Sequence, residues 1–196
     1  SNSIKDIFIP RSIKYETKEY IITSISNCSM FIDTTINSFQ FATDSEVQTI
    51  EKNVFQSISI KNLSIPSKLT ELKDGWCNQL TLNKITVSPD NPRYSMYNNQ
   101  FIIGKSSIEQ ENYDVLIFCL RSIEGEIKIP DFIEIIGPHA FENCKTIQQF
   151  EFSPDSKLRI ISNYSFSNTS IERISIPTKV KQICDHSFYC CKRLKE

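Results

Sequence analysis

Two histidines and a tyrosine recur at one position of a repeating pattern in this chain. His139, Tyr164 and His186 each stand three residues after an isoleucine. Neighbouring strands lie about 4.8 Å apart, so two repeats would separate the histidines by on the order of 10 Å. A zinc ion shared by both would need each ring nitrogen within about 2.1 Å of the metal. We therefore expect a stacked ladder with Tyr164 in the middle, and no metal site.

The spacing of the seven cysteines matches no recognisable disulfide or zinc-site pattern. Their number is odd, so at least one thiol lacks an intramolecular partner. Cys190 and Cys191 are adjacent, which is poor geometry for a mutual disulfide, and the spacing lacks the paired Cys-x-x-Cys knuckles of structural zinc sites. Cys144 and Cys191 are two repeats apart, beyond the roughly 7 Å between Cα atoms that a disulfide tolerates. Reduced thiols are favoured; a disulfide framework or a metal site stays as an alternative.

One segment imitates a phosphate-binding loop. Gly104-Lys105-Ser106 matches the end of a P-loop, but the required earlier glycine would fall at Asn99 and no helix is expected to follow. No Ser, His and Asp arrangement suggests nucleophilic catalysis. We predict no catalytic, cofactor-binding or metal-ligating residues and therefore no enzyme. A hydrolase assembled from different repeats is the alternative that the sequence leaves open.

Composition narrows the classes of partner. The 22 basic and 23 acidic residues give a formal net charge of −1, whereas nucleic-acid proteins carry a basic face. The longest apolar run, Val115 to Leu120, is far too short to span a bilayer, and no apolar stretch near Ser1 resembles a signal peptide. We expect neither a nucleic-acid partner nor membrane insertion by this segment.

The element that must position these residues is a repeat. The proline of an Ile-Pro pair precedes an apolar anchor by six residues three times, and a phenylalanine follows two of these anchors after five more. The steps are Pro66 to Leu72, Pro130 to Ile136 to Phe141, and Pro177 to Ile183 to Phe188. A period of roughly 22–25 residues indicates stacked units, each too small to bury its own apolar face.

Each repeat begins with an alternating apolar string that predicts a short strand. The middle apolar positions of seven such strands are Ile7, Phe39, Leu63, Ile85, Ile127, Phe150 and Ile174. The first interval is one repeat plus an insertion. The interval from Ile85 to Ile127 is longer still, and we interpret residues 88–124 as an inserted β-hairpin growing out of the coil. After each strand we expect a second short strand and a compact Phe-containing helical turn.

These residues resemble the BspA-type leucine-rich repeats. Ile129-Pro130 through Ile136, then Ala140-Phe141 and Cys144, match the pattern of that family nearly position by position. Ile176-Pro177, Ile183, Phe188 and Cys191 match again, and Asn91-Pro92-Arg93-Tyr94 is similar to an insertion common in the family. The match covers residues 46–196 and weakens over residues 1–45. It also departs at Cys77, which takes the place of the phenylalanine.

The resemblance implies a fold and a class of function. We expect a β-rich α/β repeat solenoid, a right-handed coil with short strands on its concave face, 3₁₀ or short helical turns, and one β-hairpin insertion. Residues 1–196 would form a single domain within a longer chain. Members of the family are non-enzymatic, have no shared cofactor, and are typically cell-surface or secreted proteins associated with adhesion to host cells or extracellular-matrix proteins.

The polar residues interleaved in the strands are the candidate partner-binding set. They would point to solvent from the concave face and form a grid, although any solvated sheet face carries polar residues. The candidates are Asn62, Ser64, Lys84, Thr86, Glu126, Lys128, Gln149, Glu151, Arg173 and Ser175.

The predicted function is a non-enzymatic protein-interaction module, displayed at a cell surface and adhesive toward a host-cell or matrix protein. The alternative is an intracellular scaffold or effector that uses the same solenoid for cytoplasmic partners. The unpaired thiols and the lack of a signal peptide favour this alternative. Solenoid ends need polar caps, so we expect either that the chain is part of a longer protein or that it self-associates through the ends of the coil.

Overall fold

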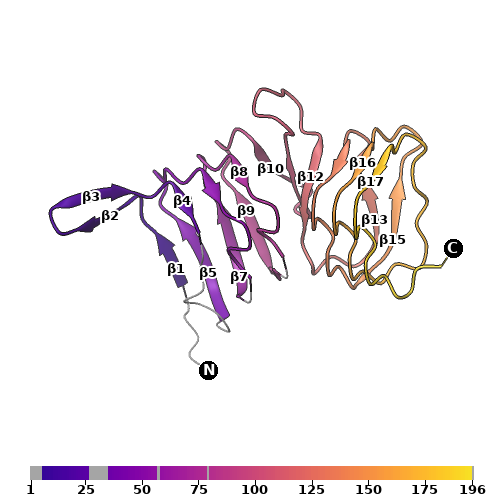
Figure 1. Cartoon of the computed structure of the whole chain (residues 1–196), viewed down its shortest axis with the longest axis horizontal. Coiled ribbons are helices and arrows are strands. Elements are labelled where there is room, and N and C mark those ends of the chain that lie inside the picture. The colour runs from indigo at the N-terminus through magenta and orange to yellow at the C-terminus, as the bar shows by residue number, and fades with distance from the viewer. Residues whose placement is uncertain (1–5, 27–34, 57, 79, 196) are drawn as a thin grey trace. The chain divides into compact units, whose positions relative to one another are not determined.

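The computed structural model describes residues 6–26, 35–56, 58–78 and 80–195. They form two compact units, residues 1–95 and 96–196, both built mainly of short parallel strands (Figure 1). The division falls within β10 (Tyr94–Tyr97). The start of the predicted first strand, Ile4-Lys5, lies outside the described residues.

The long strands of unit 1 form one parallel sheet in chain order. They are β1 (Asp6–Ile9), β5 (Thr35–Phe41), β7 (Ser59–Ile65) and β9 (Lys84–Val87). The predicted middle positions face one another: Ile7 pairs with Phe39, Phe39 with Leu63, and Leu63 with Ile85. The apolar alternation therefore predicted the register of this sheet correctly.

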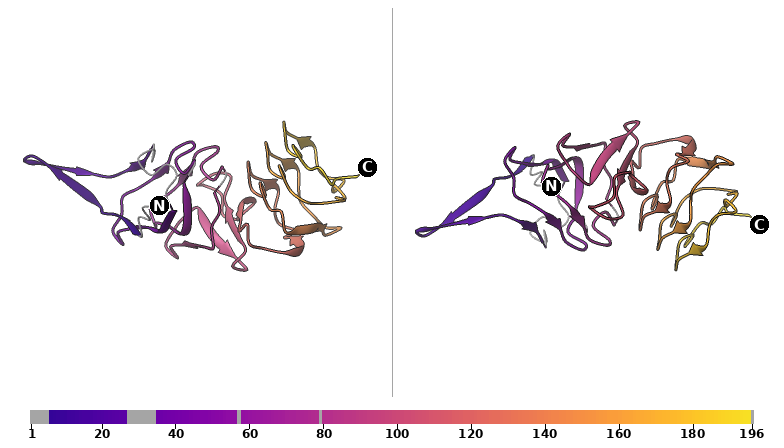
Figure 2. Two further views of the ribbon diagram at one scale, coloured as in Figure 1. Left: turned by 90° about the horizontal axis from the view of Figure 1, so that it is seen from below. Right: turned by 90° about the horizontal axis from the view of Figure 1, so that it is seen from above.

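A second row of short strands closes each turn of unit 1. It consists of β4 (Ser24–Ile25), β6 (Thr49–Ile50) and β8 (Glu71–Leu72), all parallel. The insertion expected in the first interval is an antiparallel hairpin of β2 (Ser12–Tyr15) and β3 (Lys18–Ile21). This hairpin projects from the rest of the unit in every view (Figures 1 and 2).

Unit 2 repeats the two-row plan. Its long strands are β13 (Gly125–Ile129) and β15 (Ile147–Phe152), and a parallel bridge from Phe150 to Ile174 marks the next turn. The short row holds β12 (Val115–Cys119), β14 (Ile135–Ile136), β16 (Ile160–Ile161) and β17 (Gln182–Ile183). The predicted strand positions Ile127, Phe150 and Ile174 are again neighbours.

Residues 88–124 contain an antiparallel hairpin that belongs to the sheet of unit 2. β11 (Phe101–Gly104) pairs with β12, and β12 continues in parallel into β14. Both strands of the hairpin are almost entirely buried. The hairpin thus supplies core to the coil instead of growing out of it, because its apolar side chains cover the first full turn of the unit.

The helical turns expected after the short strands are absent, and the α/β description was wrong: the described residues contain no helix. The Phe-containing segments are turns in which two residues with positive φ stand four positions apart, such as His139 at 59° and Asn143 at 62°. A left-handed residue interrupts the run of right-handed residues that a helix requires. The five residues three positions after the apolar anchors share this conformation: Asn53, Gly75, His139, Tyr164 and His186.

The turn segments of unit 2 form a third ladder of backbone bonds. The amide nitrogens of His139, Phe141 and Asn143 donate to carbonyls of the next repeat at 2.7–3.1 Å. The amides of Tyr164, Phe166 and Asn168 do the same toward the repeat that follows. Each turn of the coil is therefore bonded to its neighbour on three sides, which satisfies backbone groups that a helix would otherwise pair internally.

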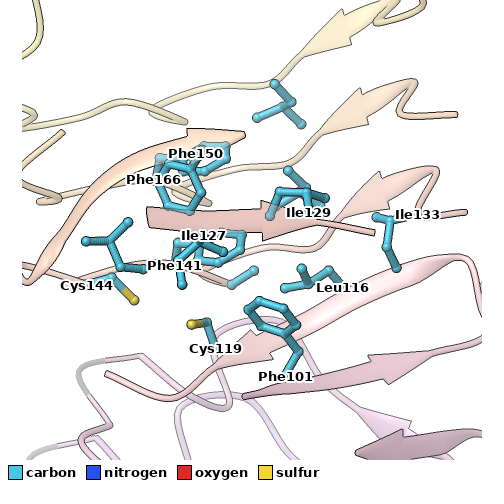
Figure 3. Close-up of a cluster of buried hydrophobic side chains, with 14 of the residues drawn as sticks. Phe101, Leu116, Cys119, Ile127, Ile129, Ile133, Phe141, Cys144, Phe150 and Phe166 are labelled. Atoms are coloured by element: carbon cyan, nitrogen blue, oxygen red, sulfur yellow. The ribbon is translucent and has the colours of Figure 1, made fainter. Parts of the chain in front are cut away.

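A column of phenylalanines fills the core of unit 2 (Figure 3). The rings of Phe141, Phe166 and Phe188 stack in successive turns with centroids 5.2 Å apart. Phe150 from β15 meets Phe141 and Phe166 edge-on at 4.7 and 4.8 Å. Such pairs add to the burial of apolar area, so the repeated phenylalanine fixes the spacing of the turns.

Candidate functional site

The outward side chains on the long strands of unit 1 form the first candidate surface, called here the unit 1 face. Asn62 lies beside Lys84, and Ser64 beside Thr86, in the parallel register of β7 and β9. Leu63, between them, is buried in the core. All four polar residues line one hollow of about 320 Å³. The sequence therefore predicted correctly that these four side chains share a face.

Hydrogen bonds fix the neighbouring part of the unit 1 face. The Asp6 carboxylate accepts bonds from the Asn37 amide at 3.1 Å and from the Ser38 hydroxyl. The Asn62 amide donates to the Asn37 carbonyl at 2.8 Å. Asn37 was not among the predicted residues, although it lies in β5 of the same sheet. Its position beside Ser38 gave no signal in the pattern.

The second candidate surface, the unit 2 face, carries more charge. Glu126 lies beside Gln149, whose amide donates to it at 3.1 Å, and Lys128 lies beside Glu151. Arg173 is in the next turn, one residue before the bridge at Ile174. Gln149 and Arg173 line a hollow of about 880 Å³, which also holds Glu124, Lys145, Glu172 and Arg193.

The ten predicted residues thus fall into two groups. Asn62, Ser64, Lys84 and Thr86 belong to unit 1, and the other six belong to unit 2: Glu126, Lys128, Gln149, Glu151, Arg173 and Ser175. Within unit 2 all six are exposed. The structure brings neighbours in register together inside each unit, so each face is treated as a separate surface. The role of these residues in binding stays a prediction.

The ladder of His139, Tyr164 and His186 is confirmed. Tyr164 stacks on His139 at 5.2 Å between ring centroids and on His186 at 4.8 Å, nearly parallel to both. The Nδ1 atom of His139 lies 3.0 Å from Glu142. Within the residues described, no group of three or more His, Cys, Asp or Glu side chains is placed to hold a metal ion.

The P-loop imitation has a structural role. Gly104 ends β11, and the amide and hydroxyl of Ser106 donate to the buried Asp114 carboxylate at 2.8 and 2.7 Å. The ammonium of Lys105 lies 5.7 Å from the centre of the Tyr113 ring. These contacts close the loop between β11 and β12, and the segment that follows Ser106 is a turn without a helix.

A cluster of two thiols and a guanidinium was missed by the sequence reasoning. Arg121 donates to the carbonyls of Cys119, His139 and Ala140 at 2.6–3.1 Å, and it approaches the Cys144 sulfur at 3.4 Å. The available signal was the spacing of the two cysteines, which stand 25 residues apart, one repeat length.

Over the part of the chain that the structure covers, no helix is long and apolar enough to cross a membrane.

The model of the BspA type leucine rich repeat region matches six copies over residues 1–102 and 117–196. The chain belongs to this family. The leucine-rich-repeat solenoid is a fold typical of protein-interaction modules. The stretch between the two matched ranges, residues 103–116, is the end of β11, the loop that Asp114 closes and the start of β12.

Solved structures show the same fold. A leucine-rich repeat protein from Eubacterium ventriosum has 23% sequence identity and a TM-score of 0.70, over 85% of this chain and 42% of that one. The pneumococcal vaccine antigen PcpA has 16% identity and a TM-score of 0.64, over 97% of this chain and 49% of the antigen. The chain spans less than half the length of both proteins. No curated protein matches it in sequence.

Proposed function

We propose that this BspA-type repeat chain is a non-enzymatic module that binds a protein ligand through its long-strand faces, displayed at a cell surface for adhesion to a host-cell or extracellular-matrix protein. The observation that carries the proposal is the in-register grid of outward polar side chains on paired strands. The backbones of paired strands are already hydrogen-bonded to one another in the sheet, so the side chains supply the donors and acceptors on the face.

The unit 1 face is well suited to recognition. Asp6, Asn37 and Asn62 are held by hydrogen bonds, so a ligand would lose little side-chain entropy on meeting them. Lys84 is an exposed cation at the edge of the hollow. The unit 2 face offers alternating charges, which favour specificity and a fast association rate over raw affinity.

Charge reversal tests the two faces separately. We expect Lys84→Glu, and Lys128→Glu with Arg173→Glu, each to weaken binding of the chain to immobilised matrix proteins and intact host cells by about tenfold, as removal of about 1.4 kcal/mol would. Binding is measured by surface plasmon resonance and flow cytometry. The unfolding transition should stay unchanged, because these side chains are exposed.

Exposed lysines elsewhere supply matched controls. Lys68→Glu in unit 1, and Lys179→Glu with Lys181→Glu in unit 2, change the charge by the same amount as the corresponding face variants without touching either long-strand face. Undiminished binding in both face variants would exclude the long-strand faces as the contact surface. If the control variants bind as weakly as the face variants, the loss of binding comes from the change in net charge and not from the faces.

An intracellular scaffold is the second candidate, and the six described cysteines favour it because all are free thiols. An antibody against the chain separates the two locations. Surface display predicts that intact cells are labelled, whereas the scaffold predicts labelling only after the cells are permeabilised.

A further inference from the structure

Two buried cysteines from successive turns of unit 2 face each other. Cys119 ends β12, and Cys144 lies in the turn after β14, one repeat later. The Cys119 amide donates to the Ala140 carbonyl at 2.9 Å, so the two segments are in direct backbone contact. Both cysteines have no exposed surface. Figure 3 shows the two sulfur atoms turned toward one another in the core, and each thiol shifts the pKa of the other.

Arg121 holds this pair in place. Its guanidinium donates to the Cys119 carbonyl at 3.1 Å and to the Ala140 carbonyl at 2.6 Å, and it lies 3.4 Å from the Cys144 sulfur. It also packs over the Phe118 ring, with the guanidinium carbon 4.4 Å from the ring centre. One cation therefore binds both cysteine-bearing segments and places positive charge next to one of the two sulfurs.

The two thiols differ in acidity as a result. Burial alone would raise the pKa of Cys144, but the hydrogen bond from Cys119 and the Arg121 charge outweigh it and lower that pKa to about 7. The same hydrogen bond, followed by burial, raises the pKa of Cys119 well above its usual value. Cys144 is thus the more acidic of the two thiols. An asymmetric pair of this kind has one attacking and one resolving thiol.

We propose that Cys119 and Cys144 are a redox pair, which forms an intramolecular disulfide when the chain meets a small-molecule disulfide oxidant of the glutathione class. Both sulfurs have no exposed surface in the folded chain, so the exchange takes place before the core of unit 2 closes. The Cys144 thiolate attacks one sulfur of the oxidant, and one thiolate leaves with its electron pair. The Cys119 sulfur loses its proton to solvent, attacks the Cys144 sulfur of the mixed disulfide and displaces the second thiolate. The protein loses two electrons and two protons, and the oxidant becomes two thiols.

The bond would tie β12 to the turn that follows β14. It closes a loop of about 25 residues, which restricts the unfolded chain and stabilises the folded one. The residues that carry it are buried and lie outside both long-strand faces. The inference therefore stands or falls independently of the proposed binding function.

Peptide mapping tests the bond directly. The full chain is unfolded and reduced, refolded in a buffer of oxidised and reduced glutathione, alkylated without reduction and digested with trypsin. Cys119 and Cys144 then fall in separate peptides, residues 106–121 and 129–145, each with one cysteine. We expect a single cross-linked species of these two peptides. The oxidised chain should melt about 5 °C or more above the dithiothreitol-reduced chain.

Matched variants keep the result specific. Cys144→Ala should abolish both the cross-link and the difference in melting temperature, whereas Cys77→Ala, which removes a buried thiol of unit 1, should leave both unchanged. Because the chain refolds in the presence of glutathione, the oxidant can reach both thiols before the core forms. Burial of the thiols in the folded chain therefore does not prevent the reaction. Separate alkylation of Cys119 and Cys144 in the refolded chain, or a dominant bond from either to another cysteine, would overturn the proposal.

Discussion

At the scale of single residues, the Ser165 hydroxyl is a buried polar group that lowers the stability of the fold. Ser165 takes the place in its turn that Ala140 takes one repeat earlier, and it is completely buried. Its hydroxyl is the one buried side-chain N or O atom, among the residues described, without a hydrogen-bond partner. The equivalent Ser187 differs because its hydroxyl donates to the Cys184 carbonyl. The same position in two successive repeats therefore holds one hydroxyl without a hydrogen-bond partner and one with a carbonyl partner.

We expect Ser165→Ala to raise the free energy of unfolding by about 1 kcal/mol, because it removes a buried hydroxyl without a partner. Urea denaturation followed by circular dichroism measures the change. Ser187→Ala is the matched control, and it should lower the stability by a similar amount because it removes a hydrogen bond. A loss of stability in both variants would mean that Ser165 has a partner after all.

At the scale of elements, one asparagine joins the segment after β9 to the segment after β7, one turn earlier in unit 1. The buried Asn91 amide donates to the carbonyls of Pro66 and Leu69 at 2.7 and 2.8 Å. Its oxygen accepts from the backbone of Arg93 and Tyr94 at 3.0 and 2.7 Å. The Asn-Pro-Arg-Tyr segment noticed in the sequence therefore works as a clamp between consecutive turns of the coil.

Asn91→Ala should lower the free energy of unfolding by about 3 kcal/mol, because two buried carbonyls and two amides lose their partner at once. Thermal and urea unfolding measure the loss. Asn83→Ala, at an exposed position before β9, serves as the control and should change the stability by no more than about 0.5 kcal/mol. Equal effects at the two positions would contradict the clamp.

The strand pattern could be predicted and the turn geometry could not. Alternation of apolar residues fixes which side chains are buried, so the register from Ile7 to Ile85 and the histidine ladder followed from spacing alone. The positive φ of Tyr164 has no such signal, because tyrosine does not favour that conformation. The prediction of helical turns failed at this point. Cys119 was missed because its hairpin interrupts the repeat.

At the scale of the whole molecule, stability should be local. In a repeat protein each turn contacts only its neighbours, so the folding energy is a sum over adjacent pairs. Phe39 is buried in unit 1, in edge contact with Phe55 at 5.3 Å, and Phe166 is buried in the phenylalanine column of unit 2. Each ring stabilises its own unit.

Phe39→Ala should therefore speed amide hydrogen exchange across the strands of unit 1 and leave most protection in unit 2, and Phe166→Ala should do the reverse. Removal of a buried phenylalanine costs about 3–5 kcal/mol, which is enough to change exchange rates by more than a hundredfold. Exchange followed by mass spectrometry reads both units in one experiment. Equal acceleration in both units by either variant would show that the chain unfolds as a single cooperative body.

The projecting hairpin of β2 and β3 also shows where this fold can change length. Its tip, Glu16 and Thr17, is exposed and connects β2 to β3, which pair with each other and with no strand of the repeating rows. A residue added inside β5 or β7 would shift every later side chain to the opposite face, whereas a residue added at the tip shifts none. Insertions in relatives should accumulate at such tips, and a fluorescent protein or affinity tag placed between Glu16 and Thr17 would leave the coil intact.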